Sequence, residues 1–175
     1  MRYLKLAELY EELSSTTKRL EKIKILSKFL SCLHEEDKEV LYLLMGDIYP
    51  EYSEKKIGIS NQLTIKAISK ATGTNEKEII KEWKLIGDIG KVAEKLIKNK
   101  KQSTLQSHIN NESNSKESLT TEKVLTNLRK LPELEGKGTV DKKISLITEL
   151  LTSASSLEAL YLTRTLIGDL RIGIK

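Results

Sequence analysis

The chain has 175 residues, of which 31% are charged, 38% hydrophobic and 5% aromatic, and its formal net charge is +5. This length suits one compact domain with a hydrophobic core, or two small domains that share an interface. No run of about 18 apolar residues occurs and the N-terminus lacks an apolar signal segment, so the sequence indicates an intracellular protein without a membrane span.

The basic residues are spread unevenly along the chain. Residues 91–130 carry 9 basic and 4 acidic side chains, whereas residues 1–50 carry 8 and 9. A local basic excess favours a polyanionic partner, although the same residues could simply keep a surface loop solvated.

Apolar residues recur at helical spacing through most of the chain. Residues 3–13 and 20–33 carry the pattern first, with the apolar positions Leu6, Leu9, Tyr10, Leu13 and then Leu20, Ile23, Ile25, Leu26, Leu30, Leu33. Further helical segments are expected at residues 39–49, 62–73, 76–87, 88–98, 121–131, 142–151 and 155–168. Only two prolines occur, and no alternating strand pattern exceeds about four residues. The sequence therefore predicts an all-α, compact domain of about ten short helices.

Helix-terminal signals agree with this division. Gly73 is suited to end one helix, and Asn75, with a glutamate three residues on, is suited to begin the next. Ser155 and Glu158 give a second capping-box pattern. The dipeptide Gly-Asp comes after a helical run at residues 46–47, 87–88 and 168–169. We interpret these dipeptides as joints between helices, in which the aspartate caps the next segment, and assign them no chemistry.

Residues 99–118 are rich in Asn, Ser, Gln and Lys and poor in apolar side chains, which predicts a long polar loop. The loop would join two helical halves, at about residues 1–98 and 119–175. The single cysteine, Cys32, excludes a disulfide framework, and with only His34 nearby it does not suggest a metal site. We expect Cys32 to be a core or half-buried thiol.

A glycine turn at residues 136–139 leads into a lysine-rich helix start. Gly136-Lys137 is followed by Gly138 and no strand precedes it, which excludes a nucleotide-binding P-loop. Thr139 is expected to cap the helix, and Lys142 and Lys143 lie in its first turn, where they oppose the helix dipole. The turn could bind a phosphate, or it could be a simple turn with solvated lysines.

Two further helix starts have the same ingredients. Gly58 and Ser60 precede a helix that carries Lys66, and a run of hydroxyl residues precedes Lys18 and Arg19. Three such starts indicate a surface that grips a sugar–phosphate backbone without reading bases. No segment is rich in the Arg, Asn and Gln that a recognition helix would need.

No catalytic constellation is present, since the two histidines lie in unrelated contexts. Within the polar loop, Gln102, Leu105, His108 and Ile109 have the spacing of the peptide by which replication and repair proteins dock on the sliding clamp. His108 and Ile109 stand where that peptide usually has aromatic residues, so an accidental match in a flexible loop is the alternative.

Five stretches together resemble the N-terminal DNA-binding domain of ATP-dependent DNA ligases of the archaeal and eukaryotic replicative type. They are residues 10–23, 58–73, 83–96, 136–151 and 158–174. The resemblance implies a helical domain that surrounds nicked duplex DNA together with the adenylation and OB-fold domains, contacting the minor groove on both sides of the nick. It also implies that the turns at residues 58–60 and 136–139 bind the phosphates.

The Lys-x-Asp-Gly sequence that such ligases adenylate does not occur in these residues. The sequence is therefore expected to be a ligase fragment, inactive alone and without a cofactor of its own. ATP and Mg²⁺ would serve the parent enzyme, which seals nicks in replication, recombination and repair. The family further implies its own catalytic core as a partner, a sliding-clamp contact through the 99–118 loop, and an archaeal cytoplasmic or eukaryotic nuclear location.

Two other functions remain open on the residues alone. A helical scaffold that binds a protein through the 99–118 loop would have no affinity for DNA at physiological salt. A helix-turn-helix regulator would discriminate strongly between DNA sequences. A ligase domain would bind duplex regardless of sequence, with a steep salt dependence.

Overall fold

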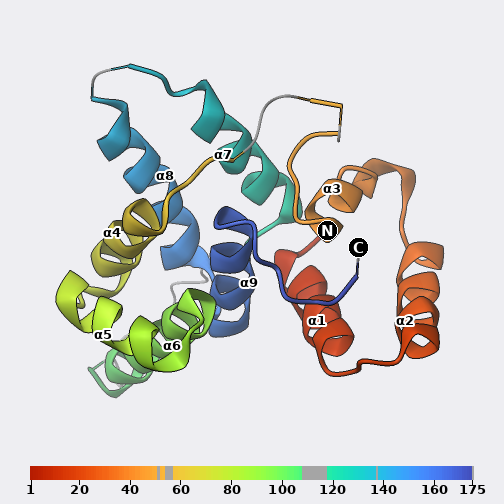
Figure 1. The fold of residues 1–175 in the computed structure, drawn as a ribbon, viewed down its shortest axis with the longest axis horizontal. Helices are drawn as coiled ribbons and strands as arrows, with labels where there is room; N and C mark the ends of the chain where they lie inside the picture. The colour runs from red at the N-terminus through yellow and green to blue at the C-terminus, as the bar shows by residue number, and fades with distance from the viewer. Residues whose placement is uncertain (51, 54–56, 108–117, 137, 175) are drawn as a thin grey trace.

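The computed structural model describes residues 1–50, 52–53, 57–107, 118–136 and 138–174, with the backbone alone for residues 101–107. Within these ranges the chain forms helices and no strand, which confirms the predicted all-α class (Figure 1). The elements are α1 (Tyr3–Ser14), α2 (Arg19–Ser31), the 3₁₀ helix η1 (Glu35–Asp37), α3 (Val40–Leu44), α4 (Asn61–Thr72), α5 (Glu76–Ile86), α6 (Ile89–Ser107), α7 (Thr121–Glu133), α8 (Thr139–Ser153) and α9 (Ser156–Leu166).

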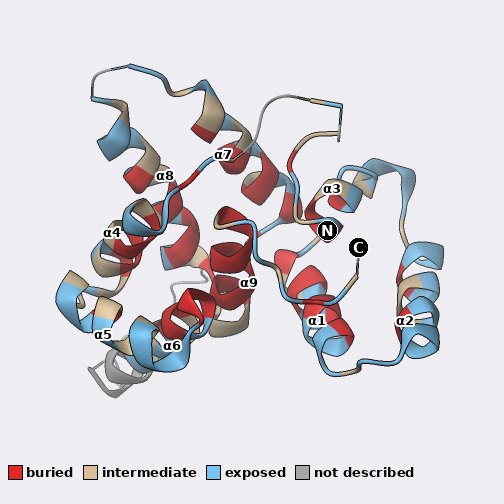
Figure 2. Cartoon of the chain, viewed as in Figure 1, coloured by how far each residue is buried: buried red, intermediate tan, exposed pale blue. Residues whose placement is uncertain are grey.

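Helix α9 lies at the centre of the fold and is buried along nearly its whole length (Figure 2). Helices α1 and α6 pack against it, and α4 packs against α8. Helix α6 crosses α9 so closely at Gly90 that a β-carbon there would lie 2.8 Å from the carbonyl oxygen of Leu160. Backbone atoms cannot move aside as a flexible side chain can, so only glycine fits this crossing.

Helix α1 buries the face that its spacing predicts. Tyr3, Leu6, Tyr10 and Leu13 are all fully buried, and the ring centroids of Tyr10 and Tyr161 lie 5.0 Å apart. Burying four such side chains contributes roughly 1.5–3 kcal/mol each to the stability of the fold. The predicted orientation of this helix is therefore confirmed.

The two predicted helical halves share one core. Helices α1, α4 and α6 come from residues 1–98 of the predicted division, except for the end of α6, and pack on α8 and α9 from the other half. The chain start is also tied to the second half, because the Tyr3 amide donates to the Leu119 carbonyl at 2.8 Å and the Thr121 amide to the Met1 carbonyl at 3.0 Å.

Helix α6 continues to Ser107, into the segment that composition predicts as a loop from residue 99. The physical reason is propagation: Val92 and Ile97 bury the first part of the helix, and each further residue then adds a hydrogen bond without a new nucleation cost. Lysine, glutamine and leucine, which dominate the continuation, are good helix formers.

Helix α2 departs from the sequence-based expectation. Leu20, Ile23 and Leu30, which the spacing assigns to the core, are 80%, 50% and 45% exposed. The helix instead packs on α1 through its adjacent flank, where Phe29 is buried. Cys32, expected in or near the core, is exposed at the end of this helix. The apolar positions of α2 span more than one face, so spacing alone did not identify which flank is buried.

Several predicted helix ends are confirmed. Gly73 and Gly87 are left-handed C-caps of α4 and α5, and the Asn75 side chain accepts a hydrogen bond from the Lys77 amide at the start of α5. Ser155 and its N3 glutamate form the capping box of α9.

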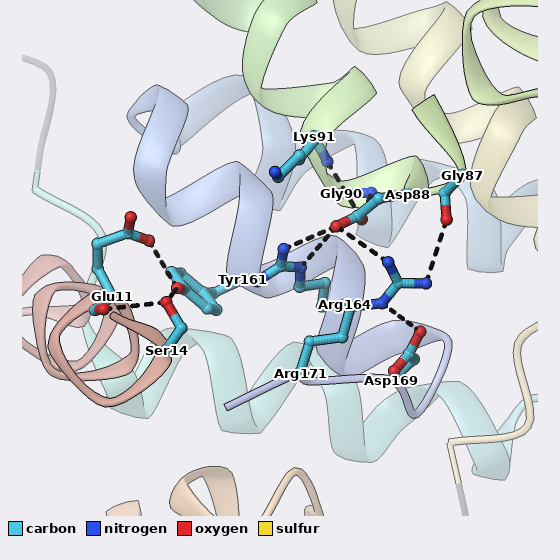
Figure 3. A network of polar contacts seen from close by, with 10 residues as sticks. All are labelled: Glu11, Ser14, Gly87, Asp88, Gly90, Lys91, Tyr161, Arg164, Asp169 and Arg171. Atoms are coloured by element: carbon cyan, nitrogen blue, oxygen red, sulfur yellow. Dashed lines mark hydrogen bonds and ion pairs between the residues drawn. The ribbon is translucent and has the colours of Figure 1, made fainter. Parts of the chain in front are cut away.

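Asp88, which the sequence suggested only as a cap, joins three segments of the fold (Figure 3). Its Oδ1 accepts hydrogen bonds from the amides of Gly90 and Lys91 at 2.9 and 3.3 Å, which caps α6. Its Oδ2 accepts from Nη2 and Nε of Arg164 on α9 at 2.7 and 3.2 Å. Arg171, in the C-terminal segment, lies 3.5 Å from the same oxygen.

The charge on Asp88 is held by these partners. Burial, which leaves the residue 4% exposed, raises the pKa of the Asp88 carboxyl, but the hydrogen bonds and charge of Arg164, the Lys91 amide and Arg171 outweigh it and hold the pKa below its usual range. Arg164 is itself 6% exposed, so each member of the pair would be a costly buried charge without the other.

The network extends along α9 to α1. The Arg164 guanidinium lies 5.2 Å from the ring centroid of Tyr161, whose hydroxyl donates to Glu11 at 2.7 Å. Burial raises the pKa of Tyr161 to about 12, and the Glu11 carboxylate adds to this rise, so the phenol stays protonated and donates. A line of polar contacts thus joins α1, α9, α6 and the C-terminal segment.

We expect Asp88→Asn to lower the free energy of unfolding at neutral pH by about 3 kcal/mol, because Arg164 would stay buried without its counter-charge. The side-chain oxygen of the new asparagine can still cap α6, so the loss of stability measures the contribution of the negative charge. The measurement is urea unfolding followed by circular dichroism. Asp169→Asn is the control: its carboxylate is exposed and pairs with Arg171 at 2.7 Å, so its loss should cost less than about 1 kcal/mol.

The same pair of proteins gives a pH test. Because the folded-state pKa of Asp88 is depressed, its contribution is complete above the unfolded value of about 4 and disappears as the pH falls through the lower folded value. The stabilities of the unmodified chain and Asp88→Asn should therefore converge in acid. A difference that stays constant from pH 7 to pH 2 would contradict the assigned role of the charge.

Candidate nucleic-acid interface

The start of α8 is built by two glycines in left-handed conformation. Gly136 and Gly138 have φ values of 98° and 81°, and the Thr139 hydroxyl donates to the Gly136 carbonyl at 2.8 Å. The prediction that Thr139 caps the helix is wrong: Gly138 is the N-cap and Thr139 is the first helical residue. Thr139 lies one residue too late to cap the helix, and its hydroxyl instead closes the preceding turn. Lys137 lies outside the described residues.

The N-cap of α8 is a glycine, so it supplies no side chain to cap the first turn. The amides at a helix start have no partner within the helix, and together with the dipole they form an anion-binding position when no side chain satisfies them. Lys142 is exposed and Lys143 half-buried in the same turn and the next. The start of α8 therefore offers amide donors and cations to one bound anion.

The start of α4 is arranged differently. The Ser60 hydroxyl caps this helix by accepting from the Leu63 amide at 3.3 Å, and Gly58 precedes it with a φ of 55°. Ile59, between them, is 8% exposed and anchors the turn in the core. Lys66 follows on the helix and is half-buried. Ile59 thus fixes the turn to the core, while Gly58 and Ser60 on either side of it are exposed.

Two of the three predicted helix starts belong to neighbouring helices. Helices α4 and α8 pack side by side, and the Thr148 hydroxyl donates to the Ala67 carbonyl between them at 3.5 Å. Lys18 and Arg19 begin α2, which lies at the opposite end of the molecule in Figure 1. Lys18 is also paired with Glu21 at 2.9 Å. The structure thus places the two helices that follow these starts side by side and leaves α2 apart.

The lysines at the starts of α4 and α8 are unpaired within the described part of the chain, although Asp141 places one exposed carboxylate in the first turn of α8. Lys66, Lys142 and Lys143 form no ion pair with any described residue, whereas Lys95 and Lys123 on other helices pair with glutamates at 2.8 and 3.0 Å. A cation with no carboxylate partner gives up less when it binds a phosphate, so these three are well suited to a polyanion.

The predicted clamp peptide falls at the edge of the described region. Gln102 and Leu105 lie in the last part of α6, of which only the backbone is described, and His108 and Ile109 lie outside the described residues. Among the described residues no group of three or more His, Cys, Asp or Glu could hold a metal ion, and no helix is long and apolar enough to cross a membrane.

The sequence-based reasoning missed the role of the C-terminal segment. Arg171 has a φ of 56°, donates to the Gly87 carbonyl at 3.1 Å and to Asp169 at 2.7 Å, and so fixes the segment against the α5–α6 joint. The recurrence of Gly-Asp was the available signal, since an aspartate at a joint can bind an arginine as well as cap a helix.

Comparison with known proteins identifies the family. A sequence profile of the family described as "DNA ligase N terminus" matches residues 2–175. The chain belongs to the DNA ligase N-terminus family. It is 46% identical over 176 residues to a DNA ligase of Methanosphaera stadtmanae, covering 98% of this chain and 30% of that protein. It is 39% identical over 173 residues to a DNA ligase of Methanothermobacter thermautotrophicus, covering 98% and 29%.

More distant archaeal relatives extend the same match. A DNA ligase of Methanocaldococcus jannaschii is 34% identical over 172 residues, covering 95% of this chain and 28% of that protein. The chain thus spans about 30% of the length of the curated DNA ligases it matches. The resemblance noted in the sequence is confirmed, and the α4 and α8 starts lie within a DNA ligase N-terminal region.

The conformation of the α8 turn can be tested at Gly138. We expect Gly138→Ala to lower the free energy of unfolding by about 1–2 kcal/mol, because an alanine at positive φ is strained. No atom lies within 4 Å of the added β-carbon, so a clash does not contribute. Gly138→Asn should cost less, since asparagine tolerates the left-handed region. Urea unfolding measures both; equal losses would contradict this explanation.

Proposed function

We propose that this chain is the DNA-binding part of an ATP-dependent DNA ligase and that it holds nicked duplex DNA by its sugar–phosphate backbone. The observation that carries the proposal is the pair of glycine-turn helix starts on the adjacent helices α4 and α8, with three lysines that pair with no described carboxylate, in a member of the DNA ligase N-terminus family.

The chemistry of the two starts favours backbone binding over base reading. Amides and lysines recognise phosphate oxygens, which are the same at every base pair, so the contacts position the protein without specifying sequence. The helix starts are short turns and would lie along the backbone, since among the side chains that the structure describes no exposed helix face carries the Arg, Asn and Gln needed to pair with base edges.

The joining reaction belongs to the rest of the parent protein in this proposal. The Lys-x-Asp-Gly sequence that the family adenylates is absent from the 175 residues. ATP and Mg²⁺ would supply the activation of the 5′-phosphate there, and this chain would supply the grip on the DNA. We place this function in the cytoplasm of an archaeal cell, in line with the archaeal relatives.

We also propose that the end of α6 contacts the sliding clamp. Gln102 and Leu105 lie three residues apart on a helical backbone, which places them on neighbouring positions of one side of the helix. The clamp-binding peptide needs its glutamine and aliphatic residue at this spacing within a short turn. The support is the spacing together with the observed helix.

The DNA-binding proposal is tested by fluorescence anisotropy of the chain with a labelled nicked duplex, an intact duplex and a single strand across a salt series. If about five cations each neutralise one phosphate, log K should fall with log salt at a slope of about −4 to −5. Binding should not change when the duplex sequence is changed. A flat salt response would rule out phosphate gripping.

Charge reversal locates the contact. Lys142→Glu combined with Lys143→Glu should weaken duplex binding tenfold or more, while the circular dichroism spectrum stays unchanged. Lys24→Glu with Lys28→Glu makes the same change in net charge on exposed residues of α2 and should have a much smaller effect. Equal weakening by both pairs would mean that net charge, and no local site, drives binding. The same change at Lys18 and Arg19 tests the third start.

The clamp proposal is tested with Gln102→Ala and Leu105→Ala together. We expect this double variant to lose binding to the sliding clamp in surface plasmon resonance while it keeps duplex binding. The control is Lys98→Ala, an exposed change on the same helix outside the peptide. Clamp binding that survives the double change would place the contact elsewhere.

A further inference from the structure

Helix α2 is held to the rest of the fold by few side chains. Of its residues, only Lys22 and Phe29 are buried, and the helix packs on α1. Ile25 and Leu26 are half-buried, and the other residues of the helix are exposed. One of the two buried side chains thus carries a charge, and the docking of α2 depends on how that charge is accommodated.

The Lys22 ammonium is accommodated by the backbone of the C-terminal segment. It donates to the carbonyls of Ile172 and Gly173 at 2.6 and 3.0 Å, and the residue is 9% exposed. No carboxylate among the described residues forms an ion pair with it. Because a buried charge is tolerated only when hydrogen-bonded partners replace water, these two carbonyls are what allow α2 to dock with Lys22 buried.

Arg171 anchors the same segment to the joint between α5 and α6. It donates to the Gly87 carbonyl at 3.1 Å and to Asp169 at 2.7 Å, and lies 3.5 Å from the Asp88 carboxylate, as Figure 3 shows. Among the described residues it is the one non-glycine residue with a positive φ, 56°, a conformation that surrounding contacts must stabilise. None of these contacts involves α2.

We propose that residues 168–174 form a releasable strap that determines whether α2 is docked on α1. When the strap leaves the α5–α6 joint, its carbonyls move away from Lys22, and the ammonium cannot stay buried without them. Helix α2 then undocks and returns Lys22 to solvent. The strap and α2 are thus released together, as one unit of local unfolding.

The strap makes the start of α2 depend on contacts in a distant part of the chain. Lys18 and Arg19 lie at this start, and their position is set by a segment about 150 residues away, which Arg171 holds at the α5–α6 joint. The inference concerns the conformation of this chain and holds whether or not the chain binds DNA, so its test uses the protein without DNA.

The test is hydrogen exchange of the α2 amides in the 175-residue chain. In the unmodified protein these amides should exchange faster than those of α9, because α2 opens while the central helix stays folded. Arg171→Gln should speed the exchange of α2 by about tenfold, although Arg171 makes none of its recorded contacts with that helix. The control is Lys95→Gln, which removes the ion pair with Glu82 on α5 and should leave α2 unchanged.

The role of the buried charge is tested in a second background. Lys22→Met keeps an unbranched, apolar side chain that can stay buried without the two carbonyls. In this background α2 remains docked when the strap detaches, so adding Arg171→Gln should change α2 exchange by less than about twofold. An undiminished tenfold effect would mean that the coupling does not pass through Lys22, and would overturn the proposal.

Gly173→Ala releases the strap from its other end. Gly173 has a φ of 62°, and a β-carbon there would overlap the Lys22 ammonium, so the variant should also speed α2 exchange. It leaves the contacts of Asp88 with Arg164 and Arg171 in place, which keeps the test valid if Arg171→Gln disturbs the core. The proposal fails if α2 exchanges no faster than α9 in the unmodified chain, or if neither Arg171→Gln nor Gly173→Ala speeds α2.

Discussion

The arrangement of the helices depends on the buried contact between Asp88 and Arg164. One carboxylate caps α6, binds α9 and lies within reach of Arg171 in the C-terminal segment. Buried charges are tolerated only when they are paired and hydrogen-bonded, so the three segments must come together at one point. The close crossing at Gly90, next to this carboxylate, fixes the distance between α6 and α9. Other contacts of α9, including those with α1, depend on that position.

The candidate DNA-binding surface consists of the starts of α4 and α8. Helix α8 packs on α4, in which Ile65 and Ile68 are buried. The starts are thus short turns on rigid supports, which suits contacts that must fit a backbone of regular spacing. The missing side-chain cap on α8 leaves amide donors open at the place where the lysines oppose the helix dipole. An anion bound here would accept hydrogen bonds from these amides and would offset the repulsion between the lysines and the positive end of the helix dipole.

The end of the molecule that carries α2 has a different character. It holds exposed apolar residues and the last described residues of the chain, where the α4 and α8 starts hold glycine turns and lysines. Arg171 and Lys22 fasten the C-terminal segment to the α5–α6 joint and to α2.

The helical class, the buried face of α1 and most helix ends could be predicted from the residues alone, because spacing and capping act within a few residues of one another. The family and the turns at residues 58–60 and 136–139 were also identified at that level. Which flank of α2 is buried depended on packing, since its apolar positions allow two orientations and α1 selects one. The pairing of Asp88 with Arg164, 76 residues away, and the separation of the α2 start from those of α4 and α8 also arise from packing. Such relations depend on how helices are placed in space, which the local pattern of any one helix does not contain.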